Sequence, residues 1–170
     1  MASIKSVVET VTNIAILLVI GVFAWVFVIH KPFWKNSSSD DKSLVGEYLS
    51  APAGYVWRDH PKTLLIAIRH DCKYCRASMP FYKKLSELRR QHQLNTALIA
   101  VMPDETSSEK SFLQENGVTL DSLFSEPLDS VKVDGTPTLM MLNSAGRIEQ
   151  EWIGKMSSKQ ENEVISAVSR

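Results

Sequence analysis

Cysteine is scarce in this sequence: only two of the 170 residues are Cys, and both fall within residues 72–75. A small secreted scaffold held together by disulfides would instead distribute several cysteines along the chain. A bond between two residues so close in sequence would close a very short loop and would hardly restrict the unfolded state. The pair is therefore better explained by chemistry than by structural cross-linking.

The sequence also lacks an excess of charge of either sign, because 19 Lys and Arg residues balance 19 Asp and Glu residues. No long block of a single sign interrupts the chain. A nucleic-acid-binding domain would show a basic patch or stripe. We therefore expect no nucleic-acid partner.

Charged residues are absent from residues 11–29, where only Thr12 and Asn13 are polar. About 20 residues of helix, at roughly 1.5 Å per residue, match a hydrocarbon core of about 30 Å. This run predicts a single-pass transmembrane helix over residues 11–30, after a short N-terminal tail over residues 1–10. The chain would then be bound to a membrane through this helix.

Two alternatives to a membrane anchor are open. A cleaved signal peptide has a shorter apolar core followed by small residues, whereas this run ends in the bulky sequence His-Lys-Pro-Phe-Trp at residues 30–34. A buried core helix normally shows a polar face, and residues 14–29 show none. Both alternatives fit the sequence less well than the anchor.

The rest of the chain divides into a linker over residues 31–43 and one domain over residues 44–170. Residues 36–43 are polar and typical of a flexible spacer. Residues 44–61 include Gly54 and two prolines, which predicts an irregular lead-in or, alternatively, a short hairpin. Roughly 125 residues suffice for one core.

Apolar runs and helical spacing alternate along this domain. Short apolar runs predict buried strands, residues 148–153 alternate as an antiparallel partner of the strand before them, and three- and four-residue spacing predicts helices. Residues 119–134 show no clear pattern. The expected strands are 63–69, 96–102, 138–142 and 148–153, and the expected helices are 72–92, 108–116 and 157–168. This order predicts an α/β domain with a mixed sheet flanked by helices.

The two cysteines stand where a strand and a short loop lead into a helix, in the sequence Cys72-Lys73-Tyr74-Cys75. The thiolate is the reactive form of cysteine, and a free thiol of pKa ~8.5 is mostly protonated at neutral pH. A helix N-terminus presents unpaired N–H groups and a positive dipole end that stabilise the anion. Cys72 is the expected nucleophile, and Cys75, one turn later, is the expected resolving cysteine.

Charged neighbours of Cys72 act in opposite directions. Arg69, Lys73 and Arg76 would favour its thiolate if they lie near the sulfur, whereas Asp71 would disfavour it. We interpret His70 as an exposed loop residue that could tune Cys72 electrostatically, rather than as a catalytic base.

A Cys-x-x-Cys pair also serves as half of a zinc site. A closed structural zinc site needs four ligands, usually with a second pair at related spacing. The four histidines of the chain include no pair separated by three to five residues. We therefore expect no metal and no other cofactor, although an inert or metal-binding pair is the alternative to redox chemistry.

With these motifs in order, the sequence resembles the thioredoxin-like superfamily, in particular its membrane-anchored branch that includes bacterial cytochrome-maturation thioredoxins. The resemblance covers about residues 44–170. It is carried by the strand before Cys72 and Cys75, by Pro80 in the following helix, and by Gly135-Thr136-Pro137-Thr138 before a strand. The segment between Cys75 and Pro137 is longer than in a minimal thioredoxin, which resembles the branch's central insertion and places it within about residues 104–130.

The resemblance implies a fold and site residues. It predicts a thioredoxin-like mixed sheet flanked by helices, in which Pro137 is cis and packs beside the cysteine pair. A cis X–Pro bond is uncommon and reflects a local demand. Here it would expose the backbone of Thr136 to pair with an extended substrate segment. An ordinary trans turn proline is the alternative.

The sequence departs from the family pattern at three places. Asp71 stands where family members usually carry Trp, and Ile66 stands where many carry a buried carboxylate that shuttles a proton to the second cysteine. Lys73 and Tyr74 replace the common Gly-Pro pair. These departures affect the redox potential, the direction of reaction and the choice of partner, so Asp71, Lys73 and Tyr74 are expected to tune the centre.

The leading interpretation is a membrane-anchored thiol–disulfide oxidoreductase, acting as a reductase in redox homeostasis. Its partners would be protein thiols and disulfides together with an upstream electron donor or acceptor. An anchor before a redox domain indicates an extracytoplasmic C-terminal domain, although Lys5 before the helix and Lys31 and Lys35 after it do not favour that orientation. The reductase direction follows from the resemblance, and a fold does not fix a function.

Two other functions are weighed against this one. A peroxide-reducing antioxidant protein of the same fold would need a Pro-x-x-x-Thr-x-x-Cys pattern, which is absent. A non-catalytic, membrane-displayed binding module would have no need of both cysteines and Pro137. Both remain alternatives at this level.

Overall fold

The computed structural model describes residues 14, 16, 19, 43–103 and 106–170. It divides into two units, residues 1–42 and residues 43–170. The predicted anchor lies almost wholly outside the described residues. Within the anchor the structure describes Ile14, Ile16 and Val19, which are helical and exposed. Within the described ranges, no helix is long and apolar enough to cross a membrane. The anchor therefore stays a prediction, as does most of the 31–43 linker.

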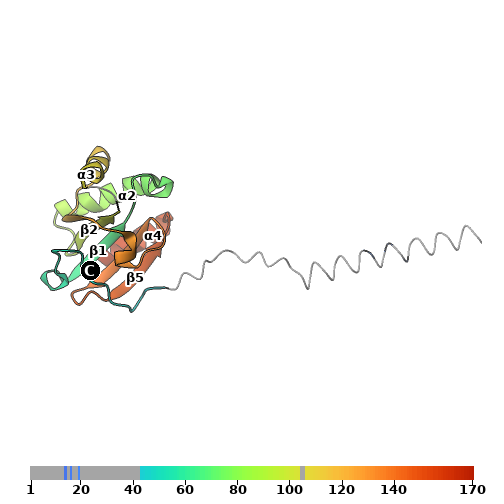
Figure 1. Cartoon of the computed structure of the whole chain (residues 1–170), viewed down its shortest axis with the longest axis horizontal. Coiled ribbons are helices and arrows are strands. Elements are labelled where there is room, and N and C mark those ends of the chain that lie inside the picture. Colours follow the sequence, from blue (N-terminus) through green and yellow to red (C-terminus); the bar gives the residue numbers. More distant parts are fainter. Residues whose placement is uncertain (1–13, 15, 17–18, 20–42, 104–105) are drawn as a thin grey trace, which may run out of the picture. The chain divides into compact units, whose positions relative to one another are not determined.

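A five-stranded mixed sheet forms the centre of the second unit (Figure 1). Its spatial order is β3-β2-β1-β4-β5. The first three of its strands along the chain run parallel to one another, β4 is antiparallel to β1, and β5 is antiparallel to β4. The strands are β1 (Lys62–Ala67), β2 (Ala97–Met102), β3 (Ser122–Ser125), β4 (Thr138–Asn143) and β5 (Ile148–Ile153). The predicted α/β architecture is confirmed.

The helices follow the spacing of apolar residues in the sequence. They are α2 (Lys73–Arg90), α3 (Thr106–Glu115) and α4 (Ser158–Val168), with two 3₁₀ turns, η1 (Trp57–Asp59) and η2 (Leu128–Val131). Ser157 caps α4 through a reciprocal capping box with Gln160, which satisfies N–H groups at its first turn. Pro80 lies inside α2, and the helix continues past it.

The core has two parts, one on each face of the sheet. Successive strand residues point to opposite faces, so Leu64 and Ile66 of β1 join one cluster while Leu65 and Ala67 join the other. The first cluster contains residues of α2, α3 and α4, and the second is closed by the lead-in and by the segment around η2. The cysteine pair belongs to the helix-covered face.

The structure decides between the two predictions for residues 44–61, an irregular lead-in and a short hairpin. Residues 44–61 do not form a hairpin of their own. Tyr48 pairs instead with Arg147, just before β5, and the Gly46 amide donates to the Ile148 carbonyl at 2.8 Å. The segment is thereby attached to the first residues of β5.

Residues 119–134, which carry no readable pattern, form β3 and η2. β3 is an edge strand with half-buried side chains, and a short strand at an edge needs no continuous apolar run. The range where an insertion was predicted, residues 104–130, thus includes the strand that extends the sheet beyond β2.

The register of the sheet positions the cysteine pair. Ala67 at the end of β1 pairs with Thr138 at the start of β4. The loop that leads from β1 into Cys72 and the loop that ends at Pro137 therefore emerge at the same edge of the sheet.

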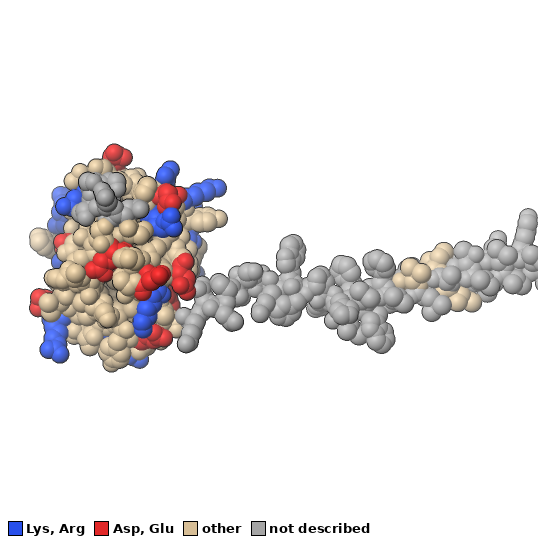
Figure 2. Space-filling model, in the orientation of Figure 1, with Lys and Arg blue, Asp and Glu red and all other residues tan. Residues whose placement is uncertain are grey.

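Charged side chains on the face seen in Figure 2 are of both signs and interspersed.

Candidate functional site

Cys72 is the N-cap of α2. Its backbone is extended, with φ −78° and ψ 117°, and its Sγ atom accepts a hydrogen bond of 3.1 Å from the Cys75 amide. Side-chain acceptors are favoured at this position because the first N–H groups of a helix have no partner within it. The sulfur thus occupies the place that a Ser or Asp oxygen would otherwise take.

The two cysteines differ in exposure. Both are free thiols; Cys72 is partly exposed, whereas Cys75 is buried with none of its surface accessible. A disulfide partner arriving from solvent can therefore reach Cys72 and not Cys75. This difference suits the roles predicted for them, attack by Cys72 and resolution by Cys75.

The environment of Cys72 favours its thiolate. Partial burial opposes ionisation, but hydrogen bonds with the Cys75 and Thr136 side chains and with the amides of Cys75 and Tyr74 outweigh it. The net effect lowers the pKa of Cys72 below its ordinary value of 9.0. The cause is hydrogen bonding to sulfur at a helix start, as expected from the sequence.

The environment of Cys75 has the opposite effect. Burial, followed by the hydrogen bond with the Cys72 side chain, raises the pKa of Cys75 to about 12. A thiol of this kind stays protonated at neutral pH. The pair therefore combines one thiol that ionises more easily than usual, Cys72, with one that stays protonated, Cys75.

The Thr136–Pro137 loop lies directly against the cysteines. The Thr136–Pro137 peptide bond is cis, as predicted. The Cys72 thiol donates to the Thr136 carbonyl at 3.4 Å, and the Gly154 amide at the end of β5 donates to the Pro137 carbonyl at 2.7 Å. The loop is thus held by β5 on one side and contacts the sulfur on the other.

The charged residues next to Cys72 are engaged with one another. Arg69 forms an exposed ion pair with Asp71 at 2.7 Å, and this hydrogen bond lowers the pKa of Asp71. The Arg76 Nε atom donates to the His70 carbonyl at 2.8 Å, so His70 is held at the mouth of the loop. Among the described residues, hydrogen bonds and burial, rather than these charges, are the largest influences on the Cys72 sulfur.

Lys73 and Tyr74 point outward from the first turn of α2. Both are exposed, and Tyr74 keeps 58% of its surface accessible although it is aromatic. These two side chains therefore lie on the surface that a partner of Cys72 would meet.

Solved structures resemble this fold. A thiol:disulfide interchange protein from Bacteroides sp. matches with a TM-score of 0.58 and 15% identity over 74% of this chain and 91% of its own. The thioredoxin domain of a thiol-disulfide oxidoreductase from Bacteroides vulgatus matches with a TM-score of 0.51 and 17% identity over 66% and 81%. A secreted disulfide oxidoreductase from Mycobacterium tuberculosis matches with a TM-score of 0.52 and 12% identity over 63% and 81%.

The chain has a thioredoxin-like fold. At these identities the likeness establishes the fold alone, and the structures it matches are thiol–disulfide oxidoreductases. No protein-family model and no curated protein sequence matches the chain.

The thioredoxin-like domain brings together all the residues that the sequence singled out. His70, Asp71, Lys73 and Tyr74 surround Cys72 and Cys75 at the start of α2, and Thr136 and Pro137 approach from the neighbouring loop. Ile66 lies in the same core cluster as Cys75, as its correspondence to the family's carboxylate position implies. Across the described residues, no three His, Cys, Asp or Glu side chains converge to hold a metal ion.

Sequence reasoning missed Tyr82. This residue was identified only as one of the apolar positions of α2, yet its hydroxyl is buried in the same cluster as Cys75 and has no hydrogen-bond partner in the described structure. The spacing from Cys75 to Tyr82, two helical turns, could have indicated that both lie on one face.

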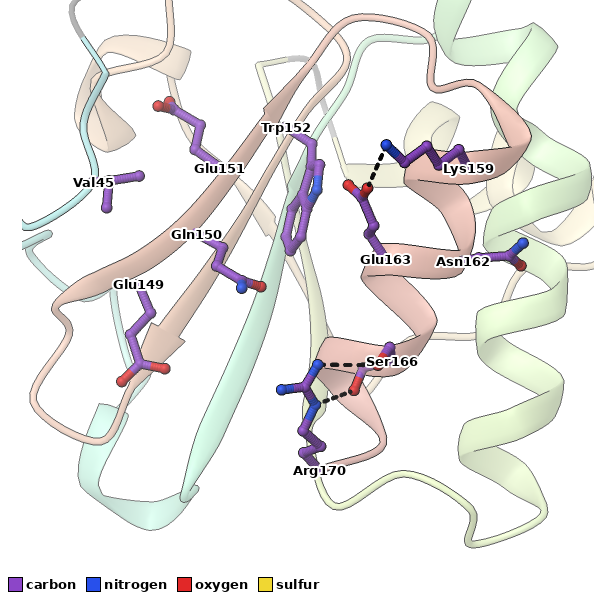
Figure 3. Close-up of a pocket in the computed structure, with 10 residues that line it drawn as sticks. All are labelled: Val45, Glu149, Gln150, Glu151, Trp152, Lys159, Asn162, Glu163, Ser166 and Arg170. Atoms are coloured by element: carbon purple, nitrogen blue, oxygen red, sulfur yellow. Dashed lines mark hydrogen bonds and ion pairs between the residues drawn. The ribbon is translucent and has the colours of Figure 1, made fainter.

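A groove of about 650 Å³ in the thioredoxin-like domain lies apart from the cysteines (Figure 3). It runs between β5 and α4, with Trp152 at its centre and an ion pair between Lys159 and Glu163 on one wall. No residue of the cysteine pair or of the cis-proline loop lines it. The groove therefore shares no residue with the site that the sequence predicted.

Proposed function

We propose that the chain is a membrane-anchored thiol–disulfide oxidoreductase that reduces disulfides of exported proteins. One observation carries the proposal. An exposed, hydrogen-bonded Cys72 sulfur stands 3.1 Å from the amide of a buried, protonated Cys75, beside a cis-proline loop. This geometry suits two successive attacks by two thiols of different acidity.

The reaction follows from the pair. The Cys72 thiolate attacks a client disulfide, forms a mixed disulfide with one client sulfur and releases the other as a thiolate. Cys75 then loses its proton and attacks Cys72 Sγ, which forms the Cys72–Cys75 disulfide and releases the second client thiol. The client gains two electrons and the enzyme loses two, so a dithiol partner must reduce the enzyme before the next cycle.

The cis-proline loop would hold the client during these steps. The Thr136 carbonyl already accepts from Cys72, and the Pro137 carbonyl is committed to Gly154. The remaining backbone of Thr136 is the group proposed to pair with an extended client segment, in the manner of an added strand.

The reductase direction rests on the balance at Cys72. Strong oxidants of this class have a reduced form that is stabilised by a very acidic thiol. Here burial opposes the thiolate, and no basic side chain of the described residues is among its largest influences. A thiolate stabilised by hydrogen bonds against burial, without a neighbouring cation among its largest influences, supports reduction of clients rather than their oxidation.

Three assays test the activity and its direction. The full-length chain in detergent is expected to reduce insulin with dithiothreitol as the electron source, and Cys72→Ser is expected to abolish this activity. A chain that consumes hydrogen peroxide but leaves insulin oxidised would support the peroxidase alternative and contradict the proposal. The equilibrium potential against glutathione decides the direction: a value near about −270 mV supports a reductase, and one near about −120 mV an oxidant.

A fourth experiment addresses clients and location. In cells, Cys75→Ser is expected to accumulate mixed disulfides on Cys72 in the membrane fraction, with the domain accessible to protease from the extracytoplasmic side. The double variant Cys72→Ser, Cys75→Ser is the control. Complete absence of adducts would favour a binding module, and protection from external protease would contradict the proposed orientation.

A further inference from the structure

Tyr82 lies on the same face of α2 as Cys75. Seven residues correspond to almost two full turns of an α-helix, so the two positions differ by only about 20° around its axis. Long and aromatic side chains in helices lean toward the N-terminus. The Tyr82 ring therefore extends from its own turn back toward the turn that carries Cys75, and both residues belong to one core cluster.

The Tyr82 hydroxyl has no hydrogen-bond partner within the described part of the chain, although only 1% of the residue is exposed. Ser78, one turn before it, is near enough to lower the pKa of Tyr82, but its hydroxyl donates to the Tyr74 carbonyl at 2.9 Å and forms no hydrogen bond with the Tyr82 hydroxyl. Buried polar atoms without a partner are rare in folded proteins, and each calls for an explanation such as a role in chemistry.

The groups that act on this hydroxyl include the redox pair. After burial, the charge of Cys75 is the largest influence that raises the pKa of Tyr82. The Ser78 hydroxyl lowers this pKa, and Cys72 and, from α4, Glu161 raise it further. Tyr82 therefore keeps its proton throughout the physiological range. It can serve as a hydrogen-bond donor and cannot serve as a base.

Cys75 lacks a buried carboxylate that would help it to ionise. The buried polar residues of the described ranges are all Ser or Thr: Thr63, Ser78, Ser86, Thr96 and Thr138. Ile66 fills the corresponding position of the core with an aliphatic side chain. The resolving step nevertheless requires a thiolate at this buried sulfur. Hydrogen bonds from the Arg69 backbone and the Thr136 side chain already lower the pKa of Cys75, yet burial holds it at about 12, so a further donor is needed to stabilise the thiolate there.

We propose that Tyr82 is that donor: its hydroxyl hydrogen-bonds the Cys75 sulfur, directly or across one water, as the thiolate forms in the resolving step. The inference rests on the proposed disulfide exchange. The Cys75 proton leaves with the departing client thiol, the Cys72–Cys75 bond forms as the Cys72–client bond breaks, and Tyr82 keeps its own proton throughout.

The test measures the two steps separately with oxidised glutathione as the client. Attack by Cys72 releases one glutathione and leaves a Cys72 adduct, and attack by Cys75 then removes the adduct. Acid quenching, alkylation and mass spectrometry give the lifetime of the adduct. The variant is Tyr82→Phe in the full chain, and the matched control is Tyr55→Phe, which removes a hydroxyl bonded to Thr63 at 2.9 Å on the opposite face of the sheet.

Loss of the donor raises the pKa of Cys75 and slows only the second step. Each pKa unit by which Cys75 rises lowers its thiolate fraction tenfold but raises the nucleophilicity of that thiolate by about threefold. A rise of about one to two units should therefore lengthen the adduct lifetime roughly three- to tenfold. Formation of the adduct, and the equilibrium potential at pH 7, should not change, because Cys75 is a thiol in the reduced enzyme. The pH at which the resolving rate reaches its plateau should rise.

Stability separates this role from a structural one. Tyr82→Phe removes an unsatisfied hydroxyl, so its melting temperature should equal or exceed that of the wild type, whereas Tyr55→Phe should lower it and leave the adduct lifetime unchanged. If Tyr82→Phe resolves at the wild-type rate, or slows both steps while it loses stability, the inference fails. If the wild type itself never forms the adduct or the internal disulfide, the proposed function fails instead.

Discussion

The amide of Cys75 and the Sγ atom of Cys72 lie 3.1 Å apart, so the buried cysteine stabilises the thiolate of the exposed one through its backbone. The same residue keeps its own thiol protonated, with a pKa of about 12. One helical turn thus separates a reactive sulfur from a reserved one, and the first prediction follows directly from this asymmetry.

Alkylation should distinguish the two sulfurs. In the reduced protein, Cys72 is expected to react with iodoacetamide with an apparent pKa below 9.0, whereas Cys75 stays unmodified until strongly alkaline pH. Mass spectrometry of peptides from a pH series gives both profiles. Equal labelling of the two cysteines near neutral pH would contradict the asymmetry.

The reduced protein should also lose stability in alkaline solution because of Cys75. In the unfolded chain this thiol ionises near its ordinary pKa of 9.0, while in the folded chain it remains protonated to about 12. The unfolded state therefore binds fewer protons between these limits, and the free energy of unfolding falls as pH rises above 9.0.

Cys72 contributes with the opposite sign. Its folded pKa lies below 9.0, so the stability it adds grows as pH rises toward 9.0 and is complete above that value. The free energy of unfolding, measured by urea denaturation with a reductant present, should therefore reach a maximum near pH 9. The decline just above it should disappear in Cys75→Ser, and a decline of unchanged slope in that variant would assign it to other groups.

Substitution of Gly146 tests how tightly the second core cluster packs around Trp57. It has φ +76°, and a Cβ atom there would lie 2.6 Å from the Trp57 ring. Gly146→Ala should cost about 1–2 kcal/mol for the left-handed backbone and about 1–3 kcal/mol more for overpacking, measured by chemical denaturation.

Gly154 offers the matched control. Its φ is +79°, but nothing lies within 4 Å of its Cβ position. Gly154→Ala should therefore show the backbone cost of about 1–2 kcal/mol alone, and the difference between the two variants measures the contact with Trp57. Equal losses in both would show that the indole moves aside without cost.

Asp121, just before β3, links this strand to β2 through its carboxylate. Its carboxylate accepts from the buried Leu98 amide at 2.7 Å and from Arg89 at 3.0 Å. Asp121→Ala leaves that amide without a partner and should cost about 1–3 kcal/mol in urea denaturation. Asp121→Asn retains an acceptor and should cost less; an equal loss would mean that the charge, rather than the hydrogen bond, carries the contribution.

Periodicity in the sequence predicted the elements that face the core and missed those at its margin. β5 begins and ends where its alternation of apolar and polar residues predicts, and α2 lies within two residues of its predicted ends. β3 and η2 were not predicted, because a half-buried edge strand and a 3₁₀ turn draw their residues from contacts with distant segments rather than from a local pattern. The lead-in was ambiguous for the same reason.

The sequence by itself determined the chemistry of this protein: two cysteines one turn apart at a helix start, and a Thr-Pro pair before a strand. These are local features, set by residue identity and spacing. Only the tertiary structure decided which sulfur is exposed, that Thr136 contacts Cys72, and that the Tyr82 hydroxyl is buried in the same cluster as Cys75. Burial and long-range pairing depend on how β1, β4 and α2 pack, and no local pattern contains that information.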